Sequence, residues 1–361
     1  MCKRIFANQT SDQGDVPFFK IGTIGGTPDA YISKDLFEEY RAKYNYPRKG
    51  EVMITCAGTV GKTIVFDGED AYFQDSNIVW LSNPKQLYIN PFLNYVLSRV
   101  NWNKLNSTTI TRIYNDNLRE LVINFPTVKE QEKVVALLSI LDQRIAIQNK
   151  VIEDLITLEK EIINHVFKTL NTVSQPLSII SERVTARNTN ALCNNVLTIS
   201  ARDGLISQLD FFNKSVASHN LSNYILLKKG DFAYNKSYSA DHPWGAIKHL
   251  EIYEEGVLSP LYFCFRPLKD HIDTEYLQLY FETDLWHKHI SDISVEGARN
   301  HGLLNMSVGD FMALPVPVPE LNIQHDIARS LKSLRNKKSN ERKYREFLLR
   351  QKTYLLSHLF L

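Results

Sequence analysis

Two long stretches of the chain place their apolar residues at alternating steps of three and four positions. The first runs from about Lys129 to Lys168 without a proline or glycine, and the second runs from Glu320 to Leu361. This spacing is typical of helices that pair as a coiled coil. At about 1.5 Å per residue, a helix of roughly 40 residues spans about 60 Å. The predicted coiled-coil residues are Leu138, Leu141, Ile145, Ile152, Leu155 and Ile162 in the first stretch and Leu331, Leu334, Leu348 and Leu355 in the second.

A different pattern, of short apolar runs separated by turn residues, precedes each of these helices. In the first globule Glu51–Thr55, Thr63–Phe66 and Asn77–Leu81 predict strands, and a helix is predicted from Pro91 to about Asn103. We therefore expect an α+β fold in four parts. These are a first globular domain at residues 1–125, a central helical spacer at 126–170, a second globular domain at 171–318 and a C-terminal helical spacer at 319–361.

The second half of the chain repeats the first. Aligning residues 126–167 with 319–360 gives nine identical positions, and the preceding globules correspond as well. A repeat of about 180 residues is too long for a solenoid and predicts two similar modules in a pseudo-two-fold arrangement, which suits a target that has two halves itself. The matched positions include Pro126 and Pro319, Gln131 and Gln324, Gly61 and Gly245, and Trp102 and Trp286.

Polar residues interrupt the apolar stripes of both predicted helices. Antiparallel pairing of the two helices covers both stripes, and the polar residues then fix the register at some expense of stability. The basic run from Arg335 to Arg345 is either a solvated helix face or a surface for a partner subunit or a phosphate backbone. The interrupting residues are Gln148 and Glu159 in the first stripe and Lys338, Glu341, Arg345 and Lys352 in the second.

The composition narrows the class of protein. The chain has 361 residues, and its net charge is only +2 at pH 7, so any nucleic-acid site must be local. No apolar run is long enough to cross a membrane. The four cysteines include no Cys-x-x-Cys pair, which argues against a zinc site or a disulfide framework. We expect a soluble, cytoplasmic protein with no membrane partner.

The sequence shows no catalytic constellation. Residues 57–63 resemble a phosphate-binding loop, but Cys56 stands where that motif needs its first glycine, so a tight turn between strands is expected. His287 and His289 lie two positions apart on a predicted helix, so they point to different faces and do not form a metal pair. We therefore predict no catalytic residues, no metal and no cofactor.

The chain resembles the specificity subunit of type I restriction–modification enzymes. The arrangement of globule, proline and long helix, occurring twice, carries this resemblance over essentially the whole chain. The strings that carry it are Gly-Asp-Val-Pro-Phe-Phe-Lys-Ile at 14–21, Lys-Gly-Glu-Val at 49–52, Phe-Pro-x-x-x-Glu-Gln-Glu-Lys-Val at 125–134, Lys-Gly-Asp-Phe at 229–232, Gly-Val-Leu-Ser-Pro-Leu-Tyr at 256–262 and Leu-Pro-Val-Pro-Val-Pro at 314–319.

The resemblance implies two target recognition domains and two helical spacers that pair as an antiparallel coiled coil. Each domain is expected to read one half of a bipartite site in double-stranded DNA, and the helices are expected to set the gap. Two methyltransferase subunits are expected to dock on this chain and to methylate DNA, usually at adenine, with S-adenosylmethionine. Restriction subunits then join through the complex. The specificity subunit itself is not an enzyme.

One departure from the family leaves other interpretations open. The opening of the second domain at 176–183 has no counterpart before Met1, so the first domain looks short at its N-terminus. The alternatives are an inactive, truncated or rearranged specificity subunit and a coiled-coil scaffold that does not read DNA. An enzyme with its own active site is disfavoured by the missing motifs.

Polar residues on predicted loops are the candidates for DNA contact, because base edges are read by Arg, Lys, Asn, Gln, Ser and Thr. Each is either a DNA contact or an ordinary surface residue. Residues 59–62 and 243–246 occupy equivalent places in the repeat, and so do 108–114 and 301–307. Readers of different half-sites should carry divergent residues on such equivalent loops. The candidates are Lys3, Arg4, Thr59, Lys62, Gln74, Ser76, Asn77, Thr109, Arg112 and Tyr114 in the first domain and Arg187, Arg202, Asn235, Lys236, Tyr238, Trp244, Arg299 and Asn300 in the second.

Overall fold

The computed structural model divides into two compact units, each of which combines one globule with part of both long helices. The first unit contains Met1–Lys150 and Arg342–Leu361, and the second contains Val151–Glu341. The structure describes residues 1–83, 87–102, 112–189, 193–200, 204–212, 220–237, 242–294 and 303–359.

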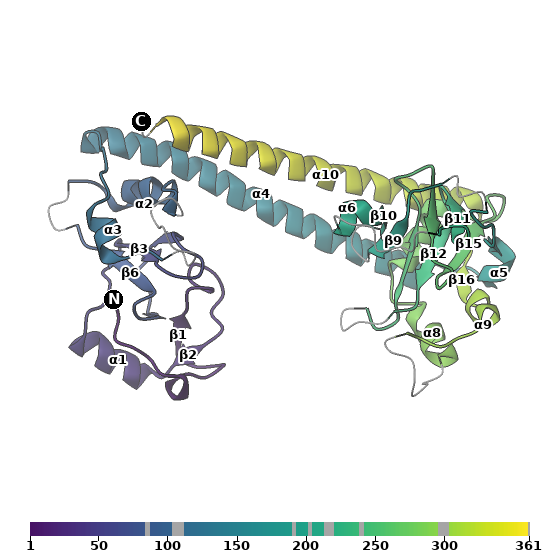
Figure 1. Ribbon diagram of the computed structural model, residues 1–361, viewed down its shortest axis with the longest axis horizontal. Coiled ribbons are helices and arrows are strands. Elements are labelled where there is room, and N and C mark those ends of the chain that lie inside the picture. Colours follow the sequence, from purple (N-terminus) through teal and green to yellow (C-terminus); the bar gives the residue numbers. More distant parts are fainter. Residues whose placement is uncertain are drawn as a thin grey trace. The chain divides into compact units, whose positions relative to one another are not determined.

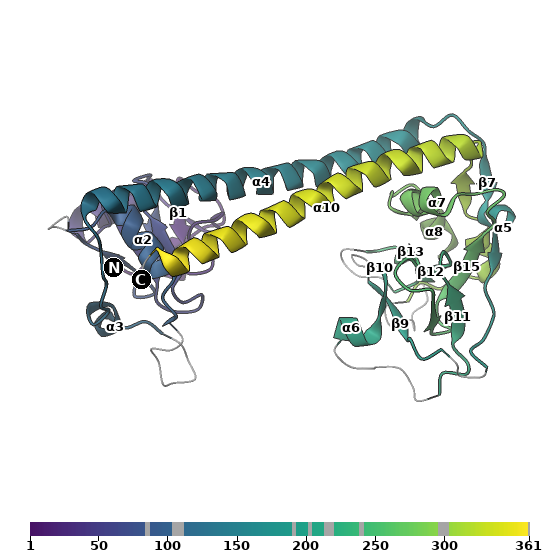
Figure 2. The same cartoon turned by 90° about the horizontal axis from the view of Figure 1, so that it is seen from above.

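The two long helices form as predicted. Helix α4 spans Val128–Thr169 and helix α10 spans Leu321–His358 (Figures 1 and 2). Neither contains a proline or glycine, so nothing interrupts the ladder of backbone hydrogen bonds. The start of α4 is closed by Glu130, whose carboxylate accepts from both the backbone N–H (3.1 Å) and the hydroxyl (2.7 Å) of Thr127.

The two helices pair in an antiparallel sense, which confirms the predicted fold class. In the first unit Asp142 of α4 pairs with Lys352 of α10 at 2.5 Å, and Arg144 donates to the hydroxyl of Tyr344 at 2.9 Å. Residue numbers therefore rise along α4 as they fall along α10. In the second unit Glu159 of α4 pairs with Arg335 of α10 at 2.7 Å.

The predicted coiled-coil residues differ in how completely they are covered. The buried ones are Leu138, Leu141, Ile152, Leu155, Leu331 and Leu348, and the half-buried ones are Ile145, Ile162, Leu334 and Leu355. The polar residues among them are covered too, since Gln148 and Glu159 are each 7% exposed. The contact face of the helix pair is therefore partly polar.

Each unit contains an antiparallel sheet with the same strand order. In the first unit the order is β4–β3–β6, and Val52 of β3 faces Val65 and Leu81. In the second unit it is β13–β12–β15, extended by β8, and Phe232 of β12 faces His249 and Phe265. The repeat seen in the sequence thus extends to strand order and register.

The first unit contains a second sheet as well. Strands β1 and β5 pair in parallel, and β2 joins β1 on its other edge. Helix α2 ends at Ser98 rather than near Asn103 as predicted, because Arg99 forms the C-cap. The elements are η1 Ala7–Gln9, β1 Val16–Phe19, β2 Tyr31–Ile32, α1 Lys34–Lys43, β3 Val52–Thr55, β4 Thr63–Val65, β5 Tyr72–Phe73, β6 Ile78–Leu81, α2 Asn90–Ser98 and α3 Asn115–Arg119.

The second unit carries its sheet together with three two-stranded sheets, β9–β10, β11–β14 and β7–β16. Its elements before α10 are β7 Ser174–Pro176, α5 Leu177–Ile180, β8 Ser181–Arg183, β9 Leu197–Ser200, β10 Gly204–Ser207, α6 Gln208–Phe212, β11 Ile225–Lys228, β12 Phe232–Asn235, β13 Ala246–His249, β14 Glu255–Leu258, β15 Phe263–Pro267, α7 Thr274–Phe281, α8 His287–Ile293, α9 Val308–Met312 and β16 Pro315–Pro317.

Aromatic packing joins the globule of the second unit to the long helices. The ring of Phe167, near the end of α4, lies 5.2 Å from the ring of Tyr276 and 5.6 Å from that of Tyr280, both on α7. Ile163 of α4 and Leu331 of α10 belong to the same buried cluster. The core of this globule therefore includes helix residues, so the helices and the globule fold as one body within the unit.

A fully buried glutamine also joins the start of α4 to the globule of the first unit. The side-chain oxygen of Gln131 accepts from the backbone N–H of Ile89 at 2.9 Å. Its amide nitrogen donates to the carbonyls of Pro126 (2.9 Å) and Leu87 (3.3 Å). One side chain therefore satisfies three backbone groups that would otherwise lack a partner.

Gln324 does the same for α10 in the second unit. Its side-chain oxygen accepts from the backbone N–H of Asp273 at 2.8 Å, and its amide nitrogen donates to the carbonyls of Pro319 (2.8 Å) and His271 (3.2 Å). The sequence repeat aligns Gln324 with Gln131, and both are 0% exposed. The shared glutamine is thus a structural part of the repeat, because it fixes how each helix leaves its globule.

Replacing Gln324 by Leu should destabilise the second unit by at least about 2 kcal/mol, because each buried backbone group left without a partner costs about 1–3 kcal/mol. Denaturant unfolding measures this free energy. The control is Gln351→Leu on the exposed side of α10, which should change stability by less than about 0.5 kcal/mol. Equal losses in the two variants would contradict the role of Gln324.

Candidate nucleic-acid interface

A tight turn joins β3 to β4 in the first unit, as predicted for residues 57–63. Gly58 and Gly61 adopt φ angles of 65° and 84°, which favour glycine. A Cβ atom on Gly61 would lie 2.1 Å from Cδ1 of Trp102, so the turn packs directly on that buried ring. The hydroxyl of Thr55 accepts from the backbone N–H of Lys62 at 3.0 Å and closes the turn.

Three predicted DNA-contact segments meet at Cys56, the first residue of this turn. The backbone N–H of Cys56 donates to the carbonyl of Asn77 at 2.7 Å, and its carbonyl accepts from the backbone N–H of Ile113 at 2.9 Å. The turn at 56–62, the turn at 74–77 and the segment 112–114 are therefore neighbours. Burial raises the pKa of the Cys56 thiol to about 11, although the charges of Arg112 and the N-terminal amine act to lower it. The N-terminal segment is thus close as well.

The second unit builds the same frame around Lys236. The carbonyl of Lys236 accepts from the backbone N–H of Leu304 at 3.0 Å, a bond similar to that between Cys56 and Ile113 but made by a residue two positions earlier in the repeat. Gly245 approaches so closely that a Cβ atom on it would lie 2.1 Å from the carbonyl oxygen of Asn235. The structure therefore brings Asn235, Lys236 and the 242–245 turn with Trp244 together.

The environment of Lys236 is partly apolar. Its ammonium group lies 4.4 Å from the ring centroid of Phe263, and burial lowers its pKa. A partly desolvated cation over an aromatic face is held in a defined position. Trp244 is half-buried, and its carbonyl accepts from the hydroxyl of Tyr234 at 2.9 Å.

The candidates of the first unit are not equally available to a ligand. The ammonium group of Lys62 donates to the carbonyl of Ile24, and Gln74 accepts from the backbone N–H of Ile21 at 3.2 Å, so both hold the fold in place. Ser76 has a φ of 51°, which is uncommon for a residue other than glycine. Lys3, Arg4, Thr59 and Tyr114 are exposed, and Arg112 and Asn77 are half-buried.

In the second unit one candidate lies apart from the others. The guanidinium of Arg187 donates to the carbonyl of Asn223, and Arg187 forms a bridge with Ile225 at the β11–β14 sheet, not beside Asn235. Five candidates lie outside the described residues, namely Thr109, Arg202, Tyr238, Arg299 and Asn300.

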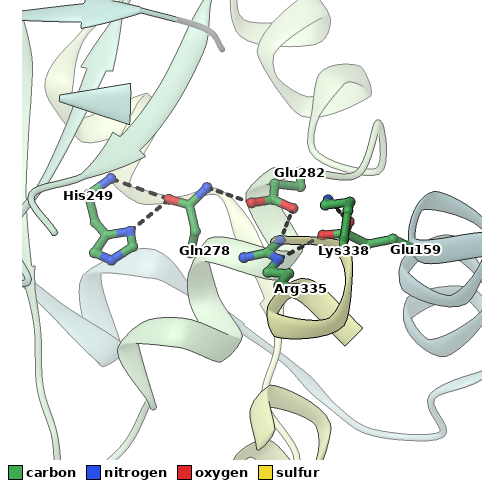
Figure 3. A network of polar contacts seen from close by, with 6 residues as sticks. All are labelled: Glu159, His249, Gln278, Glu282, Arg335 and Lys338. Carbon is green, nitrogen blue, oxygen red and sulfur yellow. Dashed lines mark hydrogen bonds and ion pairs between the residues drawn. The ribbon is translucent and has the colours of Figure 1, made fainter. Parts of the chain in front are cut away.

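Sequence reasoning missed a polar network that joins the second globule to both helices (Figure 3). Arg335 of α10 contacts Glu282, the C-cap of α7, at 2.5 Å and Glu159 of α4 at 2.7 Å. Lys338 also donates to Glu159. Burial acts to raise the pKa of Glu159, but the hydrogen bonds from Lys338 and Arg335 outweigh it and lower the pKa. Glu159 is therefore held as a carboxylate between two cations.

The network continues into the sheet of the second unit. The amide nitrogen of Gln278 donates to Glu282 at 3.3 Å. Its oxygen accepts from the backbone N–H of His249 in β13 at 3.3 Å and lies 3.1 Å from the imidazole Nδ1. Polar contacts thus run from β13 through α7 and α10 to α4. The signal for this network in the sequence was the polar residues that interrupt the apolar stripes of the two predicted helices.

The first unit has a smaller polar network that likewise connects its globule to both helices. The hydroxyl of Tyr95 on α2 donates to Asp142 of α4 at 2.8 Å, and Lys352 of α10 pairs with the same carboxylate at 2.5 Å. The Lys352 ammonium also lies 5.6 Å from the ring centroid of Tyr95. Burial raises the pKa of Tyr95, and the bond to Asp142 raises it further, so the hydroxyl keeps its proton.

Among the residues that the structure describes, no group of three or more His, Cys, Asp and Glu side chains is arranged to hold a metal ion. In the same part of the chain, no helix combines the length and apolar character needed to cross a membrane.

Comparison with known sequences identifies the first part of the chain. Residues 1–157 match the family of the type I restriction modification DNA specificity domain. A protein of Haemophilus influenzae, described as a type I restriction enzyme specificity subunit, is 50% identical over 155 residues. That match covers 43% of this chain and 40% of the relative, so the chain spans less than half the length of the relative it matches. These matches confirm the resemblance inferred from the sequence over the first part of the chain.

Comparison with solved structures identifies the fold over the whole chain. The S subunit of a type I restriction–modification system from M. genitalium is similar with a TM-score of 0.54 at 17% identity, over 100% of this chain and 92% of that one. A chain from a study of complex assembly and conformational transition of the type I R-M system is similar with a TM-score of 0.57 at 13% identity, over 96% and 91%. At these identities the likeness concerns the fold.

Proposed function

We propose that this chain is the DNA-specificity subunit of a type I restriction–modification assembly and that each globule reads one half of a bipartite site. The observation that carries this is the shared backbone frame with different side chains on it. The carbonyls of the aligned residues Cys56 and Lys236 each accept a backbone hydrogen bond from the segment that precedes a short helix, α3 in one unit and α9 in the other. Two readers of different half-sites need such a frame, because the scaffold must be the same while the base contacts differ.

The reading surface is assigned to the segments around Cys56 and Lys236. Arg112, Thr59 and Lys236 have the donors and acceptors that base edges require. The exposed Lys3 and Arg4 suit the phosphate backbone, which supplies most of the affinity and makes it depend on salt. The chain has no catalytic role in this proposal, and the assembly works on DNA in the cytoplasm.

The paired helices are proposed to set the distance between the two readers. This rests on the length of α4 and α10 and on the polar contacts that tie each globule to them. A helix pair that is anchored to a globule in each unit transmits spacing better than a flexible linker does. The gap between the half-sites then depends on helix length and not on the residues that contact bases.

Lengthening both helices by seven residues, after Lys150 in α4 and after Lys343 in α10, should widen the gap by about three base pairs. The repeat aligns these two positions, and seven residues preserve the coiled-coil period while adding about 10 Å. Sequencing of methylated DNA from a host that also expresses the methyltransferase measures the gap. The half-sites should stay the same; a changed half-site with an unchanged gap would refute the ruler.

The helix pair of the first unit also carries an apolar surface that suits a methyltransferase subunit. Ile140 and Ile147 on α4 are 54% and 64% exposed, and Phe347 and Tyr354 on α10 are 54% and 62% exposed. In each pair the residues lie seven positions apart, so they share one helix face. Both faces lie next to the hydrogen bond that Arg144 of α4 donates to Tyr344 of α10. Exposed apolar patches of this kind mark partner surfaces.

Replacing Ile147 by Lys should weaken methyltransferase binding at least about tenfold. An apolar contact that becomes buried in the complex would be lost, and the lysine charge would have to be desolvated. Binding of the purified subunits is measured directly. Asn149→Lys, on the exposed surface of the same helix turn, is the control and should bind as the wild type does. If both variants bind equally well, the methyltransferase docks elsewhere on the chain. The restriction subunits, which we propose to join through the methyltransferase, are then not attached through this surface either.

A further inference from the structure

Two of the ion pairs in the seam, as we call the contact face between α4 and α10, occupy equivalent positions of the repeat with their charges exchanged. The alignment that matches Leu138 with Leu331 also matches Asp142 with Arg335 and Glu159 with Lys352. In the first unit the acid is on α4 and the base on α10, as Asp142 and Lys352. In the second unit the acid is again on α4 and the base on α10, as Glu159 and Arg335. Each helix thus carries one sign of charge at both positions.

We propose that these charges make α4 and α10 partners of each other and prevent either helix from pairing with the same helix of a second copy of the chain. The inference concerns how the chain assembles with itself and does not depend on DNA recognition. A repeat protein faces this problem because its two helices are close relatives, so one can replace the other in a swapped dimer.

The apolar part of the seam does not prevent such a replacement. Leu155 aligns with Leu348, so that position is leucine on either helix. Two other positions even favour the wrong pair, since α4 has Ile145 and Ile152 where α10 has Lys338 and Arg345. A second α4 in place of α10 would therefore bury a more apolar seam. Discrimination must come from the charges.

The contacts in the second unit show what a wrong pairing would meet. Arg335 stands between Glu159 and Glu282, and the repeat would put Asp142 of a second copy in its place. Three carboxylates would then meet where Glu159 is only 7% exposed. The Lys338 partner of Glu159 would become Ile145, so no cation would remain from that helix. Like charges in a desolvated seam oppose pairing strongly.

Pairing of two α10 helices fails for the opposite reason. Lys352 of one copy would face Arg335 of the other, and Lys338 and Arg345 would add further positive charge to the seam. The Tyr95 hydroxyl, which now donates to Asp142, would face a guanidinium from which it can only accept, so its O–H would lose its present acceptor. The neighbouring globules therefore also favour the pairing of α4 with α10. Tyr95 stabilises an acid at position 142, and Glu282 stabilises a base at position 335.

The test uses three variants of the full chain. An all-acidic variant carries Arg335→Glu, Lys338→Glu and Lys352→Glu. An all-basic variant carries Asp142→Lys and Glu159→Lys. A combined variant carries all five substitutions together with Glu282→Lys, so it exchanges the charges between the helices and keeps an opposite charge beside position 335. Light scattering gives the mass of each protein, and thermal unfolding gives its midpoint. Lys150→Glu with Lys343→Glu, both exposed, serves as the control.

The all-acidic and all-basic variants should each lose roughly 5 °C or more in midpoint, and mixing them should give a heterodimer of twice the monomer mass. The combined variant should regain much of the lost midpoint and remain monomeric, and the control should match the wild type. The proposal is overturned if the first two variants keep the wild-type midpoint, or if the combined variant is no more stable than they are. Should the first two fail to fold, the combined variant alone decides.

Discussion

The structure depends on the pairing of α4 with α10 through a seam that is partly charged. An apolar seam alone gives stability but little choice of partner or register, whereas a buried carboxylate is stable only where a cation meets it. Glu159 between Arg335 and Lys338 defines one such point, and Asp142 beside Lys352 defines another. Because each pair also contacts its own globule, the seam fixes both the helix register and the seat of the globule on the helices.

The glutamines at the helix starts serve the same purpose by a different interaction. Gln131 and Gln324 each satisfy three backbone groups at the point where the chain passes from globule to helix. A buried amide with fixed donors and acceptors keeps all its hydrogen bonds only if the helix leaves the globule in one direction. Each globule is therefore held on the helices at two places, once by its glutamine and once by its contact with an ion pair of the seam.

The sequence predicted the parts of the fold that rest on periodicity. The helices at 128–169 and 321–358, their antiparallel pairing and the turn after β3 follow from apolar spacing, from the lack of proline and glycine, and from turn glycines. The end of α2 was placed too late, because the Arg99 cap and the packing of Trp102 depend on the folded unit. Helix boundaries set by tertiary contacts leave little trace in local sequence.

The candidate site was predictable as a set of loops but not as a set of side chains. Residues around Cys56 and Lys236 converge because the strands that hold them are neighbours, and the repeat already paired the equivalent loops. Lys62 and Gln74 have the chemistry of base readers, yet the fold uses both to hold neighbouring backbone. The contacts of Tyr95 and Glu282 with the helices had no local signal, since the residues involved are far apart in the sequence.

Sequencing of methylated positions in a host genome shows whether the two globules read two halves of one DNA site. The chain should be expressed together with its methyltransferase, and the methyltransferase alone should serve as the reference. We expect methylation at one bipartite motif, with two defined halves and a fixed gap, that appears only when this chain is present. Methylation that is unchanged by the chain, or that follows one uninterrupted motif, would contradict the proposal that two globules read two half-sites.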